Sequence, residues 1–186
     1  VRASSVAVKE AYALEYDLLY QDIDKALNNR IQESNDPRDI IKSMHREHDV
    51  TQSLPSYFTV NGRSFPYSLT DSLIIVKPDQ KIKLRVANGG GGGVALHTNG
   101  HKPTVTHLDG VEVAEAARIT RDVFSIAAAQ RTDLSLSTRD NGLDSYGPGV
   151  WLMHDHRERA ASNAGVAPGG GITAITYESL LAANGL

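Results

Sequence analysis

The sequence predicts an all-β fold of the sandwich or barrel type, preceded by an N-terminal helical arm. Three observations predict it. The hydrophobic period changes from near 3.6 residues to near 2 residues after about residue 50. Short apolar segments with alternating character then recur at spacings of roughly 8 to 20 residues, and glycine, proline, asparagine and aspartate separate them. We therefore expect a helical arm over residues 1–50 and a β-domain over residues 51–186.

The expected arm contains one apolar stripe and a second helix start. The stripe residues recur at three- and four-residue spacing: Val8, Tyr12, Tyr16, Leu19, Ile23, Leu27 and Ile31. Asp36 can cap a following helix, and Pro37 suits its first position. An amphipathic helix is marginal when isolated in water, so we expect the stripe to be buried on its own domain or on another chain. The arm is thus predicted to mediate homo- or hetero-oligomer formation.

The β-domain is predicted from eight segments separated by turn residues. They are YFTVNG, DSLIIVKPDQKIKLRVAN, GGVALHT, KPTVTHLDG, TRDVFSI, QRTDLSLST, GVWLMHDH and GITAITYE. Asn61-Gly62 is a strong turn signal after the first. The glycine run Asn88–Val94 is interpreted as a flexible turn between strands, because neither the Lys-Ser/Thr pair nor the helix of a phosphate loop follows it.

Composition excludes several function classes. The chain of 186 residues has a net charge of −3 and a pI near 6.2, which gives no electrostatic case for binding nucleic acid or an anionic membrane. No apolar run approaches the ~20 residues of a membrane helix. The absence of cysteine excludes disulfides and thiolate metal ligands, and with them a blue-copper centre within this chain.

Histidines supply the candidate chemistry. In the segment VWLMHDHRE, His154 and His156 would share one face of a strand, with Asp155 on the other. Five of the seven histidines fall between residues 97 and 156, so imidazoles would hold any metal in this stretch. Imidazole ligands suit copper or zinc, and the Irving–Williams order favours copper. The alternative is two polar residues where a strand meets solvent.

Five landmarks occur in one order along the chain: Asn-Gly before Pro, a Pro-Asp strand turn, His-x-x-Gly-His, Gln-Arg-x-Asp and Gly-x-Trp-x-x-His-x-His. With these landmarks, residues 55–178 or so resemble one cupredoxin domain of the multicopper oxidases. The resemblance implies a cupredoxin-like Greek-key β-sandwich and copper as the cofactor. It also implies a periplasmic or extracellular location.

The resemblance implies a ligand set as well. His97 matches the first histidine of the family's His-x-His-Gly motif, and His154 and His156 match both histidines of the later His-x-His motif. Asn99 stands where the second histidine of the first motif would be, which puts one ligand in doubt. Three further residues are candidates for contacts around the metal ligands: His101, Asn99 and Asp155. Asp155 could instead pair with Arg157 or face solvent. The domain thus resembles half of a trinuclear copper site without a mononuclear site.

Two functions follow as expectations. The first is copper-dependent redox chemistry or copper handling, with ligands completed by a partner domain or subunit; whether the chain itself is an oxidoreductase stays open. The alternative is a structural or assembly subunit whose metal site has degenerated, which Asn99 and the missing cysteine favour.

Overall fold

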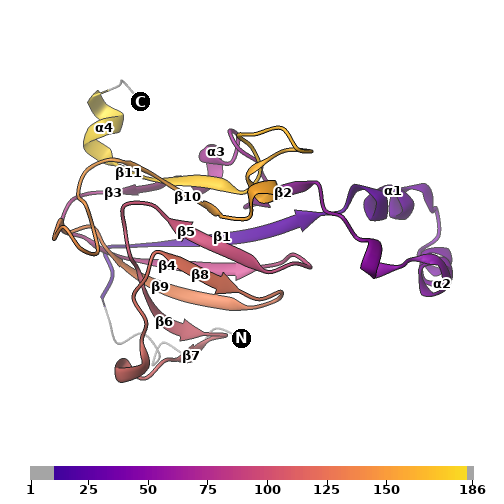
Figure 1. Ribbon diagram of the computed structural model, residues 1–186, viewed down its shortest axis with the longest axis horizontal. Coiled ribbons are helices and arrows are strands. Elements are labelled where there is room, and N and C mark those ends of the chain that lie inside the picture. The colour runs from indigo at the N-terminus through magenta and orange to yellow at the C-terminus, as the bar shows by residue number, and fades with distance from the viewer. Residues whose placement is uncertain (1–10, 184–186) are drawn as a thin grey trace.

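Two β-sheets pack face to face in the computed structural model, which describes residues 11–183 (Figure 1). The six-stranded sheet has the order β2-β1-β4-β9-β6-β7. Its strands are β1 (Leu14–Ile23), β2 (Tyr57–Val60), β4 (Lys81–Asn88), β6 (Thr104–Leu108), β7 (Val111–Glu112) and β9 (Arg131–Ser137). The five-stranded sheet has the order β3-β11-β10-β5-β8. Its strands are β3 (Ile74–Val76), β5 (Val94–Thr98), β8 (Val123–Ile126), β10 (Val150–Asp155) and β11 (Ile172–Tyr177).

Both sheets are mixed. β1 runs parallel to β4 and β11 runs parallel to β3, whereas the other pairs are antiparallel. The described chain also contains the short helices α3 (Leu69–Ser72) and α4 (Glu178–Ala183). Three 3₁₀ turns are Val50–Gln52, Glu115–Ala117 and Glu158–Ala161. All eight segments expected to hold strands do so, and the β-sandwich is confirmed.

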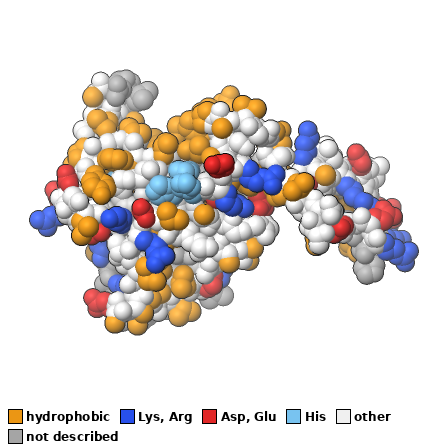
Figure 2. Space-filling view, viewed as in Figure 1, with side chains coloured by type: hydrophobic (Ala, Val, Ile, Leu, Met, Phe, Trp, Pro, Cys, Tyr) orange, Lys and Arg blue, Asp and Glu red, His pale blue; other side chains and the backbone are white. Residues whose placement is uncertain are grey.

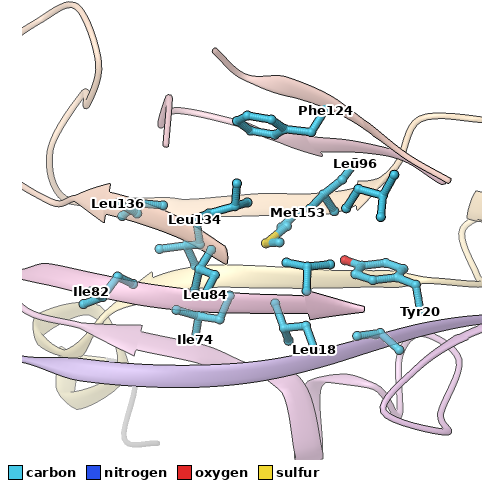
Figure 3. Packing of buried hydrophobic residues seen from close by; sticks show 14 of the residues in the cluster. Leu18, Tyr20, Ile74, Ile82, Leu84, Leu96, Phe124, Leu134, Leu136 and Met153 are labelled. Atoms are coloured by element: carbon cyan, nitrogen blue, oxygen red, sulfur yellow. The ribbon is translucent and has the colours of Figure 1, made fainter. Parts of the chain in front are cut away.

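Alternating side chains from the two sheets form the core (Figure 3). Leu84 and Leu134 lie in the six-stranded sheet and face Leu96 and Met153 of the other; all four are fully buried. Successive residues of a strand point to opposite faces. The burial of Leu96 and Met153 therefore turns their neighbours His97 and His154 to the outer face of the five-stranded sheet.

The helix prediction is wrong for Leu14–Ile23, which forms β1 between β2 and β4. Leu18 and Tyr20 are buried whereas Asp17 and Leu19 are exposed, which is the period of a strand. The expected stripe used Leu19, whose side chain is 38% exposed, and left out Leu18 and Tyr20. Pairing along both edges of β1 outweighs the local helix preference of its Leu, Glu and Gln residues. Val8 lies outside the described residues.

The second part of the arm is helical. Helices α1 (Lys25–Glu33) and α2 (Pro37–Glu47) form a hairpin that projects sideways from the sandwich (Figure 1). Asp24 caps α1 by accepting hydrogen bonds from the Ala26 and Leu27 amides at 2.9 and 3.2 Å. An ion pair joins Arg30 to Glu47 across the two helices. The hairpin is inserted between β1 and β2, two neighbouring strands of one sheet.

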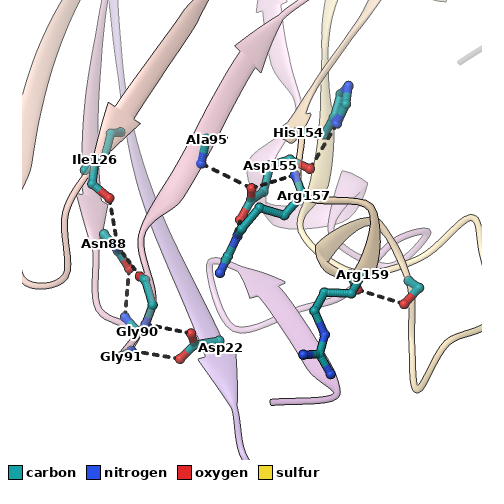
Figure 4. Close-up of polar contacts among 12 residues, drawn as sticks. Asp22, Asn88, Gly90, Gly91, Ala95, Ile126, His154, Asp155, Arg157 and Arg159 are labelled. Atoms are coloured by element: carbon teal, nitrogen blue, oxygen red, sulfur yellow. Dashed lines mark hydrogen bonds and ion pairs between the residues drawn. The ribbon is translucent and has the colours of Figure 1, made fainter. Parts of the chain in front are cut away.

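The glycine-rich loop after β4 binds a carboxylate of the chain itself (Figure 4). Asp22, near the end of β1, accepts hydrogen bonds from the Gly91 and Gly92 amides at 2.8 and 2.9 Å. The Asn88 side chain accepts a further one from Gly90 at 2.9 Å. These three amides therefore already have hydrogen-bond partners. Through the bonds to Asp22, the loop that follows β4 is held against the end of β1.

Candidate metal centre

The candidate site lies where β5 and β10 pair. His97 and His154 are direct Cα partners in this antiparallel ladder. His156 follows the last residue of β10, and its amide donates to the Ala95 carbonyl at 2.8 Å. Residues 154 and 156 share a face by strand alternation, and His97 lies on the same face by pairing.

The three imidazole rings form a nearly equilateral triangle. Ring centroids are 5.4 Å apart for His97 and His154, 5.2 Å for His97 and His156, and 5.3 Å for His154 and His156. The space-filling view shows these side chains as one patch on the surface, with hydrophobic side chains beside it (Figure 2). The three rings therefore lie close together at one level of the sheet, while convergence of their nitrogens on one point stays a prediction.

The ring nitrogens differ in their surroundings. His154 Nδ1 lies 3.2 Å from the Asp155 carbonyl oxygen, which can only accept. The ring therefore donates from Nδ1, which leaves the Nε2 lone pair free. His97 Nδ1 is buried without a hydrogen-bond partner among the described residues. Partial burial, and then the charges that His154 and His156 can acquire, lower the pKa of His97, against a smaller opposing effect of Asp122.

Comparison with known proteins identifies the family. The family model described as multicopper oxidase matches residues 18–172, which is most of the chain. The chain belongs to the multicopper oxidase family.

Solved structures agree with this assignment. A blue copper oxidase from Nitrosomonas europaea matches with 27% identity and a TM-score of 0.70, over 89% of this chain and 44% of that one. The multicopper oxidase mgLAC matches with 25% identity and a TM-score of 0.68, with the same coverage of 89% and 44%. A copper nitrite reductase from Nitrosomonas europaea, at 19% identity and a TM-score of 0.57, shares the fold. No curated protein sequence matches significantly.

The chain therefore spans less than half the length of the two oxidases with the highest TM-scores given above. Membership of the multicopper oxidase family implies copper as the cofactor. No helix in residues 11–183 is long and apolar enough to cross a membrane.

The three rings have suitable spacing for one copper ion. A copper–imidazole bond of about 2 Å, with about 1 Å more to the ring centre, places rings around one ion about 5 Å apart. As the side chains stand, no group of three or more histidine or acidic residues in residues 11–183 is arranged to hold a metal ion. Rotation about the outer torsion of a histidine turns the ring nitrogens but leaves the ring centre nearly in place, and this torsion is soft.

Asn99 and His101 lie beside the site but bind protein groups. Asn99 is the first residue after β5, in a turn, and its side-chain amide donates to the Leu152 carbonyl at 3.0 Å. His101 is buried, with Nε2 3.1 Å from the Tyr177 hydroxyl and Nδ1 3.3 Å from the Asn99 carbonyl oxygen. Burial lowers the pKa of His101. His101 therefore packs against the rings of Trp151 and Tyr177, and both its ring nitrogens have protein partners.

The Asp155 side chain points away from the rings, as the strand pattern requires. Its carboxylate pairs with Arg157, at 2.6 Å to Nη2 and 2.9 Å to Nε. The sequence left three partners open for Asp155: a histidine ring, Arg157 or solvent. The structure shows the pair with Arg157.

Proposed function

We propose that this chain is a copper-binding domain whose histidine cluster is completed by a second domain or subunit. The observation that carries the proposal is the cross-strand pairing of His97 and His154, with His156 adding the third ring on the same outer face. Three imidazoles suit copper and leave a coordination position open. The two related oxidases are named as copper proteins and are more than twice as long as this chain, which supports a missing partner.

The chain's own residues would hold the ion and shield one side of it. His154 would present Nε2, since its Nδ1 is bound to the Asp155 carbonyl. Leu96 and Met153 close the core behind the cluster and keep water from that side. Copper in such a site supplies one-electron redox chemistry. The function is then copper-dependent redox or copper handling.

Exposed apolar side chains surround the cluster on this face. Leu152 precedes His154 by two positions and is 46% exposed, and Val123 pairs with His97 and is 38% exposed. Val150 extends the same face of β10. Apolar side chains around an open metal site support a partner that covers both. A domain with further histidines is the partner that the proposal requires.

Copper titration tests the metal site. Wild-type protein should bind Cu(II), and His97→Ala, His154→Ala and His156→Ala should each weaken binding by more than the ~10–100-fold that loss of an outer contact costs. His48→Ala, which removes a histidine of the inserted hairpin, serves as the control and should leave affinity unchanged. Copper affinity that survives replacement of both His154 and His156 would contradict the proposal.

The second candidate function is structural. Asn99 favours this function. It stands where the family motif has a histidine, and its side chain is hydrogen-bonded to the Leu152 carbonyl. In this case the sandwich is an assembly subunit with a degenerate site. Wild-type protein that takes up no copper at micromolar concentration but still assembles would support this function over the first.

We propose further that the helical hairpin contacts another subunit. Ile41, Val50 and Leu54 are 71%, 73% and 66% exposed, although all three are apolar. Replacement of residues 24–56 by a short turn should lower the oligomeric state measured by light scattering. A truncated protein with the wild-type mass would show that the hairpin does not mediate assembly. A periplasmic or extracellular location also remains a proposal.

A further inference from the structure

His156 lies just beyond the end of a strand. β10 ends at Asp155, and pairing with β5 ends where Asp155 faces Leu96. Of the three clustered histidines, His156 is the one whose side chain is exposed and whose backbone lies outside regular pairing. Chain that leaves a strand opens more easily than the strand itself. Something must therefore hold His156 if its ring is to stay in the triangle.

The Asp155 carboxylate binds the backbone that follows His156 and the backbone opposite it on β5. Its Oδ1 atom accepts from the Ala95 amide at 3.2 Å and from the Arg157 amide at 3.1 Å (Figure 4). Ala95 faces His156, because its carbonyl accepts the His156 amide at 2.8 Å. The carboxylate thus takes the place of a main-chain carbonyl and continues the β5 ladder past the end of β10.

Arg157 holds the Asp155 carboxylate in one position. Its Nε and Nη2 atoms both donate to Oδ2, and the guanidinium lies 5.5 Å from the centroid of the Phe58 ring. The Asp155 side chain is 3% exposed, so without Arg157 a charge would be buried uncompensated. Charge-assisted bonds of this kind are stronger and geometrically more restrictive than neutral ones.

We propose that Asp155 and Arg157 are positioning residues for His156. They act from the core face of the strand end, through the backbone and without touching the imidazole ring. The pair holds the backbone at residues 155–157 against β5, and this places the His156 ring beside His97 and His154. The inference rests on the proposed copper site and deepens it.

Four variants test the inference. Asp155→Ala removes all four hydrogen bonds to the carboxylate, whereas Asp155→Asn keeps an oxygen for the two backbone amides. Arg157→Met removes the charge pair and leaves the carboxylate. Asp133→Ala is the control: this carboxylate forms an ion pair with the buried Lys83 at 2.9 Å, in the other sheet.

Asp155→Ala should weaken Cu(II) binding about 10–100-fold, the range for outer contacts of metal ligands. It should also change the hyperfine splitting of the Cu(II) electron paramagnetic resonance spectrum. Asp155→Asn should recover most of the affinity, and Arg157→Met should fall between the two aspartate variants. Asp133→Ala should lower the melting temperature but keep the affinity and the spectrum. Equal losses of affinity in Asp133→Ala and Asp155→Ala would overturn the inference, since stability alone would then explain them.

Hydrogen exchange without copper separates this inference from the proposed function. The His156 amide, which Asp155 does not bind directly, should exchange faster in copper-free Asp155→Ala than in wild type. Unchanged exchange would overturn the positioning role by itself, whatever the copper results. Wild-type protein that binds no copper would overturn the proposed function, and with it the copper part of this inference.

Discussion

His97 and His154 face each other as Cα partners in neighbouring antiparallel strands, with ring centroids 5.4 Å apart. The two strands that carry them are continuous with the core through Leu96 and Met153, which are fully buried. His97 and His154 therefore lie on strands that carry core residues, and only the third member of the cluster, His156, lies beyond the end of a strand. Substitutions near the histidine cluster should accordingly fall into two kinds. Some affect copper binding by the rings, and others affect the stability of the sheet.

Asn99→His should raise copper affinity. Asn99 lies two positions after His97, one residue past the end of β5, where the family's His-x-His-Gly motif has its second histidine, so we expect a histidine there to add a fourth imidazole to the cluster. We expect a gain on the order of tenfold in Cu(II) affinity by calorimetric titration, since imidazole is a favoured copper ligand. Asn99→Ala is the control, because it also loses the bond to the Leu152 carbonyl but adds no ligand. Equal affinities for the two variants would show that residue 99 cannot reach the ion.

His101 should make the copper-free protein less stable in acid. Burial lowers its folded pKa below the ordinary value of 6.5. Since the unfolded chain then binds the proton more readily, stability is full above pH 6.5 and falls as the pH drops toward the folded pKa. The free energy of unfolding, measured with urea, should fall less between pH 7.5 and 5.5 in His101→Gln than in wild type. His97 has a lowered pKa of the same sign and contributes to what remains. Identical losses would mean that His101 protonates freely in the folded state.

Gly100→Ala should destabilise the protein through Trp151. A Cβ at Gly100 would lie 2.2 Å from Trp151 Cδ2, and one at Gly149 would lie 2.5 Å from Nε1 of the same indole, so the ring has no room to move. Gly142→Ala is a matched control, because both glycines have a positive φ, +67° and +66°, but nothing lies within 4 Å of a Cβ at Gly142. Gly100→Ala should lose about 1–3 kcal/mol more unfolding free energy than the control. A difference near zero would mean that the indole is mobile.

The glycine-rich loop should tolerate alanine unevenly. A Cβ at Gly90 would lie 2.9 Å from the backbone nitrogen of Asp22, which cannot give way, whereas nothing lies within 4 Å of a Cβ at Gly91. Gly90→Ala should therefore cost about 1–3 kcal/mol in chemical denaturation. Gly91→Ala should stay within about 1 kcal/mol of wild type. Similar losses in both variants would contradict the close contact between this loop and β1.

The sequence was sufficient for the β-sandwich and for the neighbourhood of the three histidines. Alternation predicted the strands, and the His-x-His spacing with the family landmarks predicted which side chains share a face. It was insufficient for β1, because Leu18 and Leu19 are adjacent and either can belong to an apolar face. Only the pairing of β1 with β4 and β2 decides that Leu18 is inside. The partner of Asp155 also required the structure, because the sequence left a histidine ring, Arg157 and solvent equally open, and only the fold shows the pair with Arg157.

The position of the helical hairpin has a consequence for how such chains can vary. Ile23 and Tyr57 are Cα partners in the β1–β2 ladder, so the insertion of residues 24–56 leaves the sheet and returns to it at adjacent points. A tight turn could replace it without moving any strand. The same junction could accept a longer insert or an unrelated domain. The only requirement that the sandwich sets is that the two ends of the insert lie close together. Members of the family are therefore free to differ in what protrudes here without any change in the five-stranded sheet that carries the histidine cluster.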